Sequence, residues 1–299
     1  MQEAKTENEV VILPDDIVTV TKMNHLTEIQ HMEKMNTRAT IKKIDKDRYA
    51  ELSTGEIKEY KHIENRSESY NSLRQTFKKI RYLINNNFTG EKNELFLTLT
   101  YAENMTDTKR LYLDINKFIK RIKYRYKKQL YIDYLAIVEP QGRGAWHVHM
   151  LIRFNRLNSV FLPSSELSDI WDHGFVKIET IQDVDNIGAY LSAYLADVEL
   201  TEETLYSALN EDRKVIEKEV NGQKKRFVKG GRLHMYPPGM NLYRKSKGIV
   251  FPERKKMSYK NAKKIVGSAQ PHYSKRYDIE IDDFGNTVQY EQYNSNRKN

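Results

Sequence analysis

The stretch YIDYLAIVEPQGRGAWHVHMLIRF, residues 131–154, contains the pattern that decides the fold. Two β-rich runs, 131–139 and 146–154, flank a Gln-Gly-Arg-Gly turn at residues 141–144. Short runs rich in branched and aromatic residues, separated by a few turn residues that include glycine, are typical of two strands joined in a hairpin. The sequence therefore predicts an antiparallel pair of strands near the middle of the chain.

Segments with strand and helix periodicity alternate on both sides of this hairpin. The run ELFLTLTY (94–101) alternates like a strand, and residues 111–128 place apolar side chains on one helical face. After the hairpin, residues 164–172 predict a short helix, residues 175–181 a fourth strand, and Asp185 the cap of a helix that runs to Val198. This order predicts an α+β fold in which an antiparallel central sheet is flanked by helices, on a split βαβ or ferredoxin-like plan.

The remaining segments divide the chain into four parts. Residues 1–35 are polar and weakly periodic, and we expect a loosely ordered N-terminal tail. Residues 36–88 predict an accessory β-meander followed by a helix, with a turn at Ser53-Thr54-Gly55. Residues 89–211 form the predicted core. Residues 212–299 have few periodic segments and the highest basic density, and we expect them to bind DNA and to pack partly on the core.

Charge and aromatic content favour a polyanionic partner. The 299 residues carry a formal net charge of +9 and include 20 tyrosines. A groove for single-stranded nucleic acid combines cations with aromatic rings, although a solvated basic surface has the same composition. The candidate DNA-binding residues are Arg143, Lys224, Lys225, Arg226, Arg244, Lys245 and Lys247.

The absence of cysteine limits the chemistry of any metal site. With no thiolate available, a bound metal must use histidine, carboxylate or amide ligands. No apolar run approaches the roughly 18 residues that a membrane span needs, and the N-terminus lacks the pattern of a secretory signal. We therefore expect a cytoplasmic protein without a membrane partner.

His147 and His149 are the best candidates for metal ligands. Residues i and i+2 of a strand project to the same face, so the two imidazoles would lie side by side. Glu139 ends the preceding strand, and the turn brings it back toward the histidines. Two nitrogens and one oxygen suit Mn²⁺ or Mg²⁺, and Zn²⁺ less specifically. The alternative interpretation of a bare HxH pattern is a pair of surface histidines.

Tyr190 and Tyr194 are the best candidates for a nucleophile. Their spacing places both phenols on one helical face, which is also the spacing of ordinary core tyrosines. A phenol with a pKa near 10 attacks a phosphodiester at neutral pH only where the phosphate is polarised. A cation at Glu139, His147 and His149 would supply that polarisation.

These motifs together resemble the HUH superfamily, specifically the two-tyrosine rolling-circle replication initiator (Rep) proteins of Gram-positive plasmids and phages. FLTLTY (96–101) is similar to the first family motif, and Glu139 with RGAWHVH (143–149) to the second, metal-binding motif. YLSAY (190–194) is similar to the third motif, which carries the catalytic tyrosines. WDHGF (171–175) and YRKSKG (243–248) add to a resemblance that covers roughly residues 70–252.

The resemblance implies a specific activity. It implies an HUH endonuclease fold, Mg²⁺ or Mn²⁺ as cofactor, and a site- and strand-specific nick in single-stranded or hairpin origin DNA. The products would be a 5′-phosphotyrosyl intermediate and a free 3′-hydroxyl that primes synthesis. It also implies a host helicase, polymerase and single-strand binding protein as partners. Many relatives carry lysine where this chain has Ala193 and Asp197, which leaves no lysine there to steady the phenolate.

Other functions remain open on the sequence alone. A plasmid-mobilisation relaxase or a single-strand transposase would use the same chemistry, and a non-catalytic nucleic-acid-binding regulator could share the fold. We find no GxxxxGK[ST] phosphate loop, so we expect no ATP-driven helicase in this chain.

Overall fold

The structure is a computed structural model of the 299-residue chain. It describes residues 10–35, 40–60, 70–126, 131–141, 143–181, 186–189, 191, 198–199, 215–220, 223–228, 232, 235–237, 239–281 and 284–297. The chain divides into two compact units, which are described separately: Asn65–Phe251, and Met1–Glu64 together with Pro252–Asn299.

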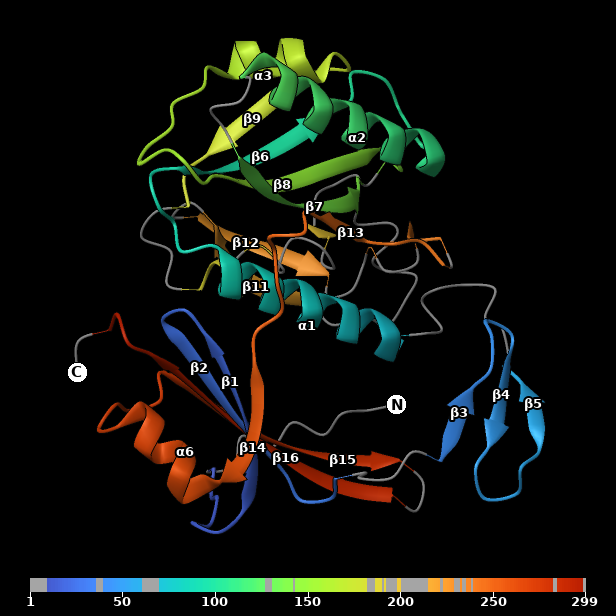
Figure 1. Cartoon of the computed structure of the whole chain (residues 1–299), viewed down its shortest axis with the longest axis vertical. Helices are drawn as coiled ribbons and strands as arrows, with labels where there is room; N and C mark the ends of the chain where they lie inside the picture. Colours follow the sequence, from blue (N-terminus) through green and yellow to red (C-terminus); the bar gives the residue numbers. More distant parts are fainter. Residues whose placement is uncertain are drawn as a thin grey trace. The chain divides into compact units, whose positions relative to one another are not determined.

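A five-stranded antiparallel sheet forms the centre of the unit Asn65–Phe251 (Figure 1). Its order is β13-β7-β8-β6-β9, with bounds β6 Glu94–Thr100, β7 Ile132–Pro140, β8 Trp146–Phe154, β9 Val176–Glu179 and β13 Tyr243–Lys245. Since β6 and β7 both run antiparallel to β8, they run parallel to each other with β8 between them. The segment that joins β6 to β7 contains α2, so the predicted split βαβ plan is confirmed.

Helices cover both faces of this sheet. They are α1 Tyr70–Asn87, α2 Thr108–Arg125 and α3 Ser164–Trp171. In Figure 1, α2 and α3 lie on one side of the sheet and α1 on the other. Two side chains of β8 show the same division: the Trp146 indole donates to the Thr106 carbonyl beside α2, and Arg153 donates to the Asn87 carbonyl at the end of α1. The α+β class with an antiparallel sheet and flanking helices is therefore confirmed.

The two faces of β8 differ in the way that the alternation predicts. Trp146, Val148, Met150 and Ile152 are all buried on the face toward α2. His147 and His149, on the opposite face, are only partly buried. Leu151 on this second face is also buried, because that end of the face packs into the main hydrophobic core, which also includes side chains of α1.

The strand β13 extends the sheet beyond the predicted core of residues 89–211. It pairs with β7, and Ser246 just after it donates to Oδ1 of Asp133 at 2.7 Å and accepts from the Tyr134 amide at 3.1 Å. Gly248 follows, where a Cβ would lie 2.2 Å from Oδ1 of Asp133. The YRKSKG stretch therefore attaches the end of the unit to β7. Its partner lies about a hundred residues earlier, too far for local periodicity to reveal.

A second, three-stranded sheet belongs to the same unit. Its order is β10-β12-β11, with bounds β10 Val198–Glu199, β12 Gln223–Val228 and β11 Val215–Val220. The sequence predicts that a helix runs to Val198, but Val198 pairs with Val228 in β12. A β-branched residue fits this ladder well, and the pairing across the chain overrides the local helical pattern.

The other unit contains a five-stranded antiparallel sheet built from both ends of the chain. Its order is β14-β1-β2-β16-β15, with bounds β1 Ile17–Met23, β2 Leu26–Met32, β14 Arg254–Ser258, β15 Tyr273–Ile281 and β16 Phe284–Asn294. Helix α6, Tyr259–Val266, packs its Ala262 into the core of this unit. The expectation of a loosely ordered tail over residues 1–35 is wrong for its described part. Val18, Val20 and Ile29 are buried there, and strands from the end of the chain cover them.

The predicted meander over residues 36–88 is confirmed in its strands. β3 Ile41–Lys43, β4 Arg48–Glu51 and β5 Ile57–Glu59 pair in order. Gly55 in the predicted turn has a φ of +75°, which a glycine adopts without strain. Helix α1, expected in the same part, belongs to the other unit.

In the described residues, no helix combines the length and the apolar character that crossing a membrane requires.

Candidate metal site

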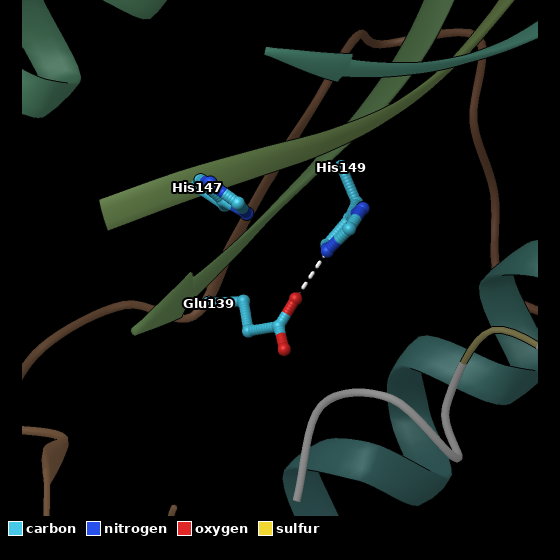
Figure 2. A group of neighbouring side chains, drawn as sticks. All are labelled: Glu139, His147 and His149. Carbon is cyan, nitrogen blue, oxygen red and sulfur yellow. Dashed lines mark hydrogen bonds and ion pairs between the residues drawn. The ribbon is translucent and has the colours of Figure 1, made fainter. Parts of the chain in front are cut away.

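Glu139, His147 and His149 converge on one face of the central sheet (Figure 2). Glu139 lies near the end of β7, and the register of the hairpin places it directly opposite His147 on β8. His149 follows two residues later on the same face. One ligand atom from each side chain lies within 4.8 Å of the other two. The hairpin therefore brings together the three residues that the sequence proposes as ligands.

The His149 ring is held from two sides. Its Nε2 contacts Oε2 of Glu139, and its Nδ1 lies 3.2 Å from Oγ1 of Thr98 on the neighbouring strand β6. Phe96 stacks on the ring, with centroids 5.7 Å apart and an interplanar angle of 16°. Contacts of this kind on the second nitrogen fix the orientation of metal-binding histidines. Thr98 was not among the residues singled out from the sequence, although its place in the first motif strand is a usable signal.

His147 carries the unexplained polar atom of the site. Its Nε2 is buried and has no hydrogen-bond partner among the described residues. Its ring is nearly perpendicular to that of His149, with centroids 6.4 Å apart. A buried imidazole nitrogen without a partner costs free energy unless a ligand satisfies it. A cation bound by the three side chains would do so.

Burial keeps both imidazoles neutral. It lowers the pKa of His147 from 6.5 to about 4, and the neighbouring charges of His149 and Arg143 act in the same direction. Burial likewise lowers the pKa of His149 to about 4, against a smaller opposite effect of Glu179. Neutral imidazoles are the form that binds a metal. The site is therefore in its ligand form throughout the neutral range.

Arg232 supplies a positive charge at the edge of the site. Its guanidinium forms an ion pair with Oε1 of Glu139, the oxygen that does not contact His149. The two oxygens of Glu139 thus have different neighbours. Burial lowers the pKa of the Arg232 guanidinium, and its Nε is buried without a hydrogen-bond partner in the described part of the chain. The sequence placed Arg232 only in a basic tract, because no local pattern connects residue 232 to residue 139.

The donor set fits a divalent cation. Two neutral imidazoles and one carboxylate are borderline and hard ligands, compatible with Mg²⁺, Mn²⁺ or Zn²⁺. The three side chains come from a rigid hairpin, and His147 has a buried nitrogen to offer. The alternative of two unrelated surface histidines does not explain this convergence.

The two candidate nucleophiles, Tyr190 and Tyr194, lie outside the described residues, as do Asp185, Ala193 and Asp197. The residues around Tyr190 that are described pack on α1. The Gly188 amide donates to Oδ1 of Asn85 at 2.7 Å, and a Cβ on Gly188 would lie 2.7 Å from the carbonyl oxygen of Arg81. Asn186 accepts from the Ala189 amide at 2.8 Å, which is the hydrogen bond of a helix N-cap.

The candidate DNA-binding residues are spread over both faces and several strands. Arg143 lies close enough to His147 to affect its pKa. Arg244 instead stacks over the Tyr112 ring of α2 at 4.3 Å, and so faces away from the histidines. Lys245 donates to the Ile249 carbonyl at 2.6 Å, Lys247 is exposed, and Arg226 is exposed on β12. Lys224 and Lys225 lie on β12, with side chains outside the described set.

Comparison with known proteins gives one match. Residues 94–199 match a family model described as the replication-associated protein ORF2 family. This segment, less than half of the chain, includes β6 to β9 and all three candidate ligands. The match supports a protein of the rolling-circle replication initiator type. Neither the curated proteins nor the solved structures gave a match to the chain.

Proposed function

We propose that this protein is a metal-dependent endonuclease and strand transferase that nicks one strand of its origin DNA and thereby initiates rolling-circle replication. The observation that carries the proposal is the convergence of Glu139, His147 and His149 within a segment that matches a replication-associated family. A replication regulator without catalytic activity would not need an unpaired imidazole nitrogen buried beside a carboxylate.

The three side chains would hold Mg²⁺ or Mn²⁺. When bound, the cation would supply Lewis-acid polarisation of the scissile phosphate. Glu139 would contribute the only negative charge of the ligand set, and the imidazoles would bind through Nε2. For His149 this requires the proton on Nδ1, where the ring can donate it to Thr98. The chain thus selects the tautomer that leaves the inward nitrogen free.

The reaction we propose is a transesterification by Tyr190 or Tyr194. The phenol oxygen forms a bond to phosphorus while the bond from phosphorus to the 3′ oxygen breaks. The phenol proton ends on that oxygen, which gives a 5′-phosphotyrosyl link and a free 3′-hydroxyl. The second phenol, about one helical turn or roughly 5 Å away, would attack at the end of a round and release the circle.

The direct experiment is covalent trapping. Single-stranded oligonucleotides that tile the DNA around the coding sequence are incubated with the protein and Mn²⁺, and adducts are resolved under denaturing conditions. We expect an adduct with Mn²⁺ and none with EDTA. His147→Ala and the double variant Tyr190→Phe/Tyr194→Phe should both form none, whereas Tyr124→Phe, at a tyrosine that is 78% exposed on α2, should behave like the unmodified protein.

Two results would contradict the proposal. One is a robust adduct in the double phenylalanine variant, or on a tyrosine outside residues 190 and 194 when the linked peptide is mapped by mass spectrometry. The other is tight binding of origin DNA with no adduct under any metal, which would indicate a non-catalytic binding protein.

A further inference from the structure

Phe175 is a large apolar side chain left exposed beside the candidate metal site. It precedes β9, the edge strand of the central sheet, and 59% of it is exposed. The next residue, Val176, is buried in the core on the face toward α2. Because side chains alternate along a strand, Phe175 and Lys177 project from the opposite face, which is the face of the histidines.

The register of the strands aligns these two side chains with the site. Lys177 pairs with Thr98, which pairs with His149. The Thr100 amide donates to the Phe175 carbonyl at 3.1 Å, and Thr100 pairs with His147. Phe175 and Lys177 are therefore each two strands away from a histidine. At roughly 4.8 Å per strand, that separation is about 10 Å.

The position of Phe175 is fixed by the turn before it. Trp171 donates its indole N–H to the Thr100 carbonyl at 3.0 Å. Gly174 has a φ of +155°, and a Cβ on it would lie only 2.2 Å from the Thr100 oxygen. The turn is thus in backbone contact with the end of β6, so the aromatic ring is carried by a rigid support.

Packing does not account for an exposed phenylalanine at this position. Phe175 is not a member of the hydrophobic core. Exposed apolar residues on edge strands favour aggregation, and proteins usually place charges there instead. Lys177, which is paired with Glu179 at 2.8 Å, has that ordinary explanation; Phe175 does not.

An aromatic ring and a cation on the rim of a nuclease site fit one ligand chemistry. Single-stranded nucleic acid is bound by stacking bases on aromatic rings and by pairing phosphates with cations. We propose that Phe175 and Lys177 form a subsite that stacks the base, and pairs the phosphate, of a nucleotide flanking the phosphate held at Glu139, His147 and His149. This inference rests on the proposed function.

The test uses a fluorescent reporter of stacking. The chain contains two tryptophans, Trp146 and Trp171, and both are buried. In Phe175→Trp an exposed indole is added at the subsite, and stacking of a base on it quenches its emission. The matched control is Phe161→Trp, because Phe161 is an exposed phenylalanine (88%) of the same unit. The probes are an oligothymidylate of roughly 12 nucleotides and an abasic strand of the same length.

We expect the oligothymidylate to quench Phe175→Trp but not Phe161→Trp, and the abasic strand to quench neither. The affinity of Phe175→Ala for the oligothymidylate should be about 5- to 150-fold lower, since stacking contributes that much per base. Phe161→Ala should bind like the unmodified protein, and Lys177→Gln should bind more weakly in low salt.

Absence of quenching, or unchanged affinity of Phe175→Ala, would overturn the inference. Neither result would affect the proposed function, which is tested separately by the metal-dependent adduct. If the adduct fails while stacking is observed, the subsite stands as part of a binding protein.

Discussion

Oγ1 of Thr98 lies 3.2 Å from Nδ1 of His149, across the pairing of β6 with β8. This contact fixes which nitrogen of the ring faces Glu139. The residue that orients the ligand therefore belongs to a different strand from either part of the hairpin that supplies the ligands.

Thr98→Val should weaken metal binding without loss of the fold. The change keeps the shape of the side chain but removes the hydroxyl that holds the His149 ring. Loss of such an outer contact costs about 10- to 100-fold in metal affinity, which calorimetry with Mn²⁺ would measure. Thr98→Ser keeps the hydroxyl and should retain most of the affinity. Equal affinity of the valine variant and the unmodified protein would show that the contact does not orient the ring.

Metal affinity should change little between pH 7.5 and pH 5.5. Burial lowers the pKa of both imidazoles to about 4, so protons begin to compete with the metal only as the pH approaches that value. Histidines with an ordinary pKa of about 6.5 would be about nine-tenths protonated at pH 5.5. Titration of Mn²⁺ by electron paramagnetic resonance at several pH values distinguishes the two cases. A steep loss of affinity centred near pH 6.5 would contradict the buried site.

The same pKa values set the acid stability of the metal-free protein. Because each folded-state pKa lies below the unfolded value, the unfolded chain takes up protons first as the pH falls. The stability of the fold should therefore be unaffected by these groups above about pH 6.5 and should decline between about pH 6.5 and pH 4. Urea unfolding across that range would measure the decline, and His147→Ala/His149→Ala should reduce it.

Arg232→Ala should make the fold depend on metal. The substitution leaves the buried Glu139 carboxylate without its ion-pair partner, and breaking a buried pair typically costs about 3–5 kcal/mol. Mn²⁺ would supply the missing positive charge. We therefore expect Mn²⁺ to raise the melting temperature more in Arg232→Ala than in the unmodified protein. An equal rise in both would mean that Arg232 does not compensate the charge of Glu139.

Gly248→Ala should destabilise the sheet at β13. The new methyl group would lie 2.2 Å from Oδ1 of Asp133, which also accepts the Ser246 hydroxyl. Overpacking of this kind typically costs about 1–3 kcal/mol, measurable by urea unfolding. Gly285→Ala, where nothing lies within 4 Å of the added Cβ, is the control and should be close to neutral. A neutral Gly248→Ala would show that β13 can shift away from β7 at little cost.

The basic residues of β12 should contribute to DNA affinity through phosphates alone. If they contact the backbone of single-stranded DNA, the logarithm of the binding constant falls with that of salt by about 0.7 per phosphate. Replacing Lys224, Lys225 and Arg226 together with glutamine should flatten this slope by up to about 2, equally for all sequences. An unchanged slope would identify them as a solvated surface.

Local periodicity was sufficient to predict the central strands and the ligand set. β8 has the bounds expected from its alternation, and β7 differs from the expectation by one residue at each end. Glu139 could be linked to His147 because a short turn separates them, so the pairing is set within one hairpin. The predictions succeeded where the determining contacts lie close in sequence.

Contacts between distant segments could not be predicted in the same way. β13 and Arg232 reach β7 from about a hundred residues away, and β1 and β2 acquire their partners from the end of the chain. None of these segments has a pattern that identifies its partner. A short or polar-rich strand becomes recognisable only when the strand beside it is known.

The pairing of β2 with β16 also has a consequence for biosynthesis. A ribosome adds β16 more than two hundred residues after β2, when Asn65–Phe251 has already been made with its own hydrophobic core. Because domains generally fold as units during translation, we expect the unit that holds the metal site to form on the nascent chain first. The hairpin of β1 and β2 would meanwhile wait, with both of its outer edges open, for β14 and β16. Chaperone contact during synthesis should therefore concentrate on this N-terminal hairpin rather than on the catalytic sheet.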